Sequence, residues 1–80
     1  MKHRTLLKSE DFAVANQHVA VRYFEARTER GARRYSAEIL LAPGDHIILD
    51  DDSVKSLETR ATRLVPATIY SRRLARLDAA

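Results

Sequence analysis

The chain has 80 residues, 45% of them hydrophobic and 31% charged, with a net charge of +3 and an isoelectric point near 9.7. This composition is typical of a folded protein and excludes an intrinsically disordered one. The chain has no cysteine, which excludes disulfides, thiolate metal sites and a cysteine nucleophile. We expect a single small domain spanning 1–80, with frayed ends at 1–4 and 78–80.

The first fifteen residues carry five charged side chains, so they contain no apolar segment of the kind that a secretory signal requires. No run in the chain approaches the ~18 apolar residues of a membrane span. We therefore expect a cytoplasmic protein that does not associate with membranes.

Residues 9–17 predict a short N-terminal helix. Ser9 can cap it, Glu10 and Asp11 would lie in its first turn, and Phe12 would face the core. Two turns of helix are marginal without tertiary support, so a loop or a strand remains an alternative here.

Three strands are expected next, over 18–28, over 35–42 and from His46 to the acidic run that starts at Asp50. Alternating and β-branched residues indicate these strands, and turns are expected at Gly31 and at Pro43-Gly44-Asp45. Paired residues of an antiparallel sheet share a face, so placing Val21 beside Ile39 requires pairs with an even sum and an odd-numbered loop. We expect three-residue loops at both turns.

A helix should follow, capped by Ser53 or Asp52. One apolar stripe recurs at helical spacing, formed by Val54, Leu57, Ala61, Leu64 and Val65. Pro66 should stop or kink the helix. Ile69, Tyr70, Leu74 and Leu77 then suit a second amphipathic helix, and a strand built on Val65, Ala67 and Ile69 is the alternative.

These elements predict an α+β fold. Its centre is a three-stranded antiparallel β-meander packed against a C-terminal helix that is kinked or broken at Pro66, with a short N-terminal helix as an option.

The sequence contains no recognisable catalytic or metal-binding motif. His3, His18 and His46 do not share a motif with a serine, and two glycines cannot build a phosphate loop. Asp50, Asp51 and Asp52 are adjacent, so their side chains cannot all point at one ion, and helix capping accounts for them. We expect no enzyme activity, no metal and no cofactor.

The surface should be rich in arginine. Lysine occurs only at 2, 8 and 55, so 14 − 3 leaves eleven arginines among the basic residues. Ordinary solvated side chains are the simpler interpretation of these arginines. The alternative is a nucleic-acid surface on the first hairpin and the helix, formed by Arg27, Arg30, Arg33, Arg34, Arg60 and Arg63.

Phe24, Leu40 and Ile48 alternate away from the predicted core and should lie on the second face of the sheet. If this face is open, the three side chains form an apolar patch that marks a protein interface or a homodimer. If residues 1–17 fold over it with Leu6, Leu7 and Phe12, the face is simply covered. The sequence thus predicts a small protein-interaction module, with nucleic-acid binding as the alternative function.

Overall fold

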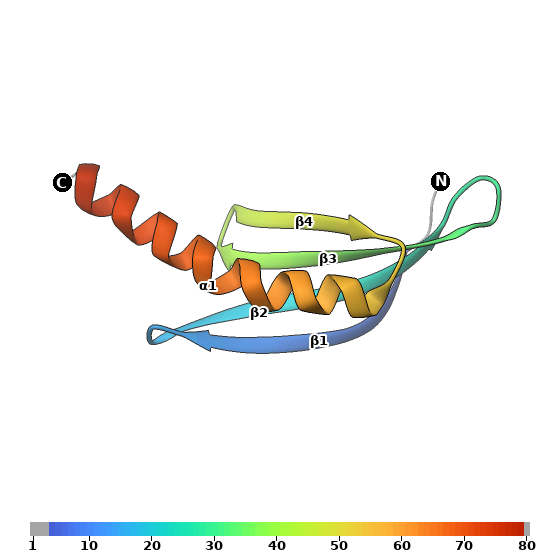
Figure 1. Cartoon of the computed structure of the whole chain (residues 1–80), viewed down its shortest axis with the longest axis horizontal. Helices are drawn as coiled ribbons and strands as arrows, with labels where there is room; N and C mark the ends of the chain where they lie inside the picture. Colours follow the sequence, from blue (N-terminus) through green and yellow to red (C-terminus); the bar gives the residue numbers. More distant parts are fainter. Residues whose placement is uncertain (1–3, 80) are drawn as a thin grey trace.

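A computed structural model describes residues 4–79 as a four-stranded antiparallel sheet with one long helix against it, an α+β arrangement (Figure 1). The strands are β1 (Arg4–Val14), β2 (Gln17–Arg27), β3 (Arg33–Ala42) and β4 (Asp45–Asp51), and the helix is α1 (Val54–Ala79). The sheet is a meander with the order β1-β2-β3-β4, so β1 and β4 are its edges.

The expected three-stranded sheet and N-terminal helix were wrong, because residues 4–14 form a fourth strand. In β1, Lys8, Glu10 and Phe12 lie opposite Tyr23, Val21 and Val19, so charged side chains occupy part of its helix-facing side. This placement removes the alternation of apolar and polar residues that would have revealed the strand. The expected fraying at 1–3 and 80 lies outside the described residues, whereas Arg4 is already in β1 and 78–79 continue α1.

The turn between β1 and β2 consists of Ala15 and Asn16, whose φ angles are +50° and +65°. Two successive positive φ values are the signature of a type I′ turn, which joins antiparallel strands with only two residues. Asparagine tolerates this conformation better than most residues do, but alanine does not, so the sequence carries a weak turn signal.

The pairing of β2 with β3 confirms the expected parity, since Val21 lies opposite Ile39 and Tyr23 opposite Ala37. The loop between them, 28–32, has five residues rather than three. Thr28 organises it by accepting hydrogen bonds from the Gly31 amide at its carbonyl and from the Ala32 amide at its hydroxyl. Gly31 has a φ of +82°, which glycine adopts without strain.

The three-residue loop expected between β3 and β4 was wrong. Ala42 pairs with Asp45 across a two-residue Pro43-Gly44 turn, and the register shifts between Leu40 and Ala42. The bulge at Leu41 corrects the parity, so that Ile39 lies opposite Ile47 on the core side and not opposite Leu49 as a three-residue loop would require.

The core lies between the sheet and the first four turns of α1. Its buried residues are Val19, Val21, Tyr23, Ala37, Ile39, Leu41, Leu57, Ala61, Val65 and Ile69. The helix begins after Ser53, whose hydroxyl accepts a hydrogen bond from the Ser56 amide at 3.3 Å. The predicted cap and apolar stripe are therefore confirmed, apart from Val54 and Leu64, which are only partly buried.

The helix break expected at Pro66 was wrong, because α1 runs through that residue as a single helix of 26 residues. Pro66 cannot donate to the carbonyl of Thr62, but Thr62 is exposed, so water can bond that carbonyl. The end of α1 extends past the β3–β4 turn, beyond the sheet (Figure 1). Leu74 and Leu77 in this part are 62% and 71% exposed.

Candidate interaction surface

The face of the sheet opposite α1, here called the open face, has no element packed on it within residues 4–79 (Figure 1). Its large apolar side chains are Leu6, Phe24, Leu40 and Ile48, and Leu6, Leu40 and Ile48 are 53%, 37% and 57% exposed. The alternative in which residues 1–17 cover this face was wrong for residues 4–17, because β1 extends the sheet instead. Phe12 packs on the helix side, while Leu6 joins the open face.

The three predicted interface residues share the open face but do not form one row. Phe24 pairs with Leu6 near one end of the sheet, and the Arg4 guanidinium lies 4.2 Å from its ring centroid. Leu40 and Ile48 are diagonal neighbours toward the other end. Glu38 lies between these two patches on β3.

Glu38 makes the strip between the patches polar. It lies 3.7 Å from the Arg4 guanidinium and 3.6 Å from that of Arg22, so one acid serves two bases. The open face therefore has a charged centre, with one acid between two bases, and an apolar patch on either side. This mixture of apolar patches and paired charges differs from the uniformly basic surface that phosphates select.

A shallow hollow of about 530 Å³ lies on the open face beside the Leu40 patch. It is lined by Asp11, His18, Ala20, Leu40, Leu41, Ala42 and Pro43. His18 Nδ1 is 3.2 Å from the Asp11 carboxylate, but both side chains are more than half exposed. The hollow thus offers one solvated His–Asp pair and no hydroxyl or thiol nucleophile in its lining.

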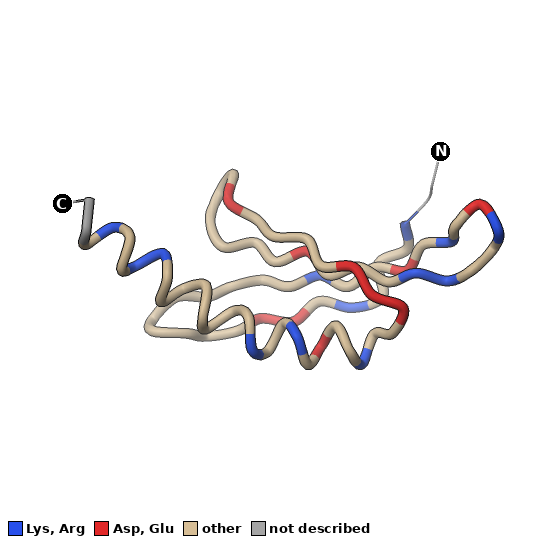
Figure 2. Tube along the Cα trace, turned by 45° about the horizontal axis from the view of Figure 1, so that its top comes forward, with Lys and Arg blue, Asp and Glu red and all other residues tan. Residues whose placement is uncertain are grey.

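Most of the predicted nucleic-acid contacts are occupied within the chain. Arg34 bonds Asp50 at 2.9 Å, and Arg33 lies 3.5 Å from Glu25. Arg27 donates to the Gly31 carbonyl at 3.4 Å. Their hairpin end also carries Glu29, a single acidic position among the basic ones (Figure 2).

Two further predicted contacts, Arg60 and Arg63, belong to α1, whereas Arg34 lies on the open face of the sheet with Asp50, so the six arginines do not form one patch. Arg60 donates to the Asp50 carbonyl and the Asp51 carboxylate, at 3.1 and 3.2 Å. Within residues 4–79, Arg30 and Arg63 have neither an ion pair nor a hydrogen bond from their side chains.

The side chains of Asp50 and Asp51 point to opposite faces of the sheet, as successive residues of a strand do. Asp50 turns to Arg34 on the open face, whereas Asp51 turns to α1 and accepts hydrogen bonds from the Ser56 hydroxyl and the Asp52 amide, both at 2.7 Å. The Ser56 hydroxyl, together with the Asp52 amide and Arg60, holds the pKa of Asp51 well below its ordinary value of 3.8. The contacts of Asp51 with Ser56 and Arg60 hold the start of α1 against β4.

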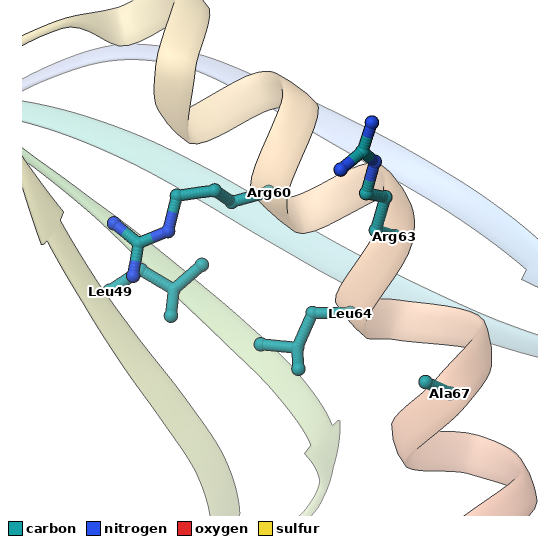
Figure 3. Close-up of a pocket in the computed structure, with 5 residues that line it drawn as sticks. All are labelled: Leu49, Arg60, Arg63, Leu64 and Ala67. Atoms are coloured by element: carbon teal, nitrogen blue, oxygen red, sulfur yellow. The ribbon is translucent and has the colours of Figure 1, made fainter.

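A second hollow, of about 360 Å³, opens between α1 and the β4 edge and is drawn in Figure 3. Leu49 of β4 and Leu64 and Ala67 of α1 form its apolar lining, and Arg60 and Arg63 flank it. The Arg60 guanidinium reaches over toward Leu49, while that of Arg63 turns away from the hollow (Figure 3). Sequence reasoning missed this site because periodicity assigns Leu64 to the core and does not show how far α1 lies from the edge strand.

No family model, curated protein or solved structure was found to match this chain. Within residues 4–79, the helix lacks the length of apolar sequence needed to cross a membrane.

Proposed function

We propose that this chain is a small non-enzymatic protein-interaction module that binds another protein chain through the open face. The observation that carries the proposal is the exposure of Leu40 and Ile48, diagonal neighbours on a sheet face that no described element covers. Monomeric proteins rarely leave an apolar patch beside an unpaired strand edge without a binding role.

The surface also has the layout of an interface. Apolar patches lie on both sides of the Glu38 ion pairs, which would fix the orientation of a partner. The adjacent β4 edge supplies backbone donors and acceptors for an added strand. The lack of cysteine suits action in the reducing cytoplasm.

The test compares the chain with two surface variants by size-exclusion chromatography of extracts from its natural host. The chain should elute in a species larger than its own 9.1 kDa, and Leu40→Glu with Ile48→Glu should shift it to the monomer position. Thr59→Glu, on the exposed outer side of α1, should leave the large species intact. Elution of the unaltered chain as a 9.1 kDa monomer, or the same profile for both variants, would overturn the proposal.

Nucleic-acid binding is the second candidate, and one observation supports it: Arg30, in the projecting 28–32 loop, and Arg63 have no ionic partner among the described residues. This function predicts binding to DNA or RNA that weakens steeply as salt rises, and Arg30→Glu should reduce it. Phosphate contacts are strong at low salt, so binding should be detectable at about 50 mM salt. Absence of binding to duplex and single-stranded probes under that condition would eliminate the nucleic-acid function.

A further inference from the structure

The outer edge of β4 is the least protected strand edge of the sheet. Figure 1 shows no element beyond it, and its centre is the apolar run Ile47-Ile48-Leu49. The other edge, β1, is interrupted by a bulge between Leu6 and Lys8 and carries the charged Lys8 side chain, both of which discourage strand addition. A partner that adds a strand is therefore expected at β4.

We propose that β4 pairs antiparallel with β4 of a second copy, with a two-fold axis at Ile48, to form a continuous eight-stranded sheet. This inference rests on the proposed function, because it names a second copy as the partner. In this register the paired residue numbers sum to 96, so each side chain meets one from the same face of the other sheet.

On the open face, Ile48 lies against the second copy's Ile48. Its exposed fraction of 57% is the largest of the large apolar side chains on the sheet, and the pairing covers it. His46 lies opposite the second copy's Asp50, and the symmetry repeats this contact. An imidazole facing a carboxylate is a favourable cross-strand pair.

On the helix side, Ile47 lies opposite the second copy's Leu49. Leu49 lines the 360 Å³ hollow with Leu64 and Ala67, so the incoming Ile47 side chain covers apolar surface that is otherwise open to water. The apolar hollow is thus filled by an apolar side chain of the second copy, from the strand that pairs with β4.

The register also places Asp45 opposite the second copy's Asp51, and each of these acids already has its own base. Arg72 donates to Asp45 at 2.8 and 2.9 Å, and Arg60 donates to Asp51 at 3.2 Å. Arg63, without an ionic partner among the described residues, flanks the same hollow. The repulsion between the two carboxylates is therefore offset by neighbouring guanidinium groups.

Ile48→Cys tests the register, because the chain has no other cysteine and a residue on the axis meets its own copy. Antiparallel partners lie about 4.5–5.5 Å apart between Cα atoms, within the range that a disulfide spans. Mild oxidation of the purified variant should give a disulfide-linked dimer at least about tenfold faster than Leu40→Cys or Leu6→Cys, which lie on the same face away from the axis. Equal rates for the three variants would overturn the proposed pairing.

A charge exchange tests the His46–Asp50 contact by sedimentation equilibrium. His46→Asp should weaken the dimer about tenfold, because it places like charges together twice across the axis. Adding Asp50→Lys should restore association, since the carboxylate introduced in one copy would then face the ammonium group introduced in the other. Thermal unfolding of each variant separates lost association from lost folding. Failure of the double variant to recover, with folding intact, contradicts the register.

These results are distinguishable from failure of the proposed function. If the purified chain stays monomeric while Leu40→Glu with Ile48→Glu still removes the large species in extracts, the partner is a different protein. The self-pairing inference is then wrong, and the open-face module remains. If the large species is also absent from extracts, the self-pairing inference and the proposed function are both wrong.

Discussion

Arg72 donates two hydrogen bonds to Asp45, at 2.8 and 2.9 Å, and so joins the projecting half of α1 to the first residue of β4. A second contact lies close by in the chain, where Arg73 donates to the Ala15 carbonyl in the β1–β2 turn at 2.6 Å. Two adjacent arginines thus tie the helix to two different turns of the sheet. Both arginines follow Ile69, the last buried residue of α1, so their contacts hold the helix where it passes the end of the core.

The first prediction concerns this connection. Arg72→Ala should accelerate amide hydrogen exchange over 70–77, because the helix loses its fork-like contact with Asp45. Exchange at the buried Leu57 and Ala61 should not change. Hydrogen exchange followed by NMR measures both regions, and equal acceleration in both would show that Arg72 supports the whole fold rather than the projecting end.

Two leucines on the same helix provide a matched test of the core. Leu57 is fully buried, so Leu57→Ala should lower the free energy of unfolding by about 3 kcal/mol through lost burial and a residual cavity. Leu74 is 62% exposed, and Leu74→Ala should change the free energy of unfolding by less than about 0.5 kcal/mol. Urea denaturation measures both variants. Similar losses would contradict the placement of α1 on the sheet.

Tyr23 has a buried hydroxyl that finds no hydrogen-bond partner within the described residues, and burial raises its pKa. Tyr23→Phe should therefore leave the free energy of unfolding unchanged or raise it by up to about 1 kcal/mol, because it removes an unsatisfied polar group. Tyr70→Phe, at a side chain that is 61% exposed, is the control and should have no effect. A large loss of stability in Tyr23→Phe would indicate that the hydroxyl is bonded in solution.

The lowered pKa of Asp51 predicts how the free energy of unfolding changes at acid pH. Hydrogen bonding lowers its pKa in the folded state, so its contribution is complete above the unfolded pKa and is lost as pH falls through the folded value. The free energy of unfolding should decline from about pH 5 toward pH 2. Asp51→Asn should flatten this decline, as measured by denaturation at several pH values. Parallel curves for the two proteins would assign acid sensitivity to other groups.

Pro66 lies inside a continuous helix and leaves the Thr62 carbonyl without its amide partner. Pro66→Ala should restore that hydrogen bond and raise the free energy of unfolding by about 1–2 kcal/mol, after allowing for the greater freedom of the unfolded chain. Thermal unfolding followed by circular dichroism measures the change. Destabilisation would mean that the Pro66 ring makes packing contacts more important than the missing bond.

The central part of the fold was predictable from residues with a single clear role. The alternation around Val21 and Ile39 established two strands and their parity, and Ser53 with the Leu57-Ala61-Val65 stripe established the helix. These signals work because burial repeats with the period of the backbone.

The missed features depend on contacts that no local pattern contains. β1 places Lys8 on the helix side, where it donates to Glu58, so a long-range ion pair replaces an apolar residue. The bulge at Leu41 allowed a two-residue turn while preserving the core. The exposed positions of Phe24, Leu40 and Ile48 were foreseen, but their division by Glu38 depends on the pairing register.

The most direct test of the open face is photo-cross-linking in living cells with benzoylphenylalanine placed at one surface position at a time. Substitution at Leu40, on the open face, should yield a specific covalent adduct with another protein chain. Substitution at Thr59, on the exposed outer side of α1, should yield none. Adducts at both positions, at Thr59 alone, or at neither would contradict the assignment of the open face as the binding surface.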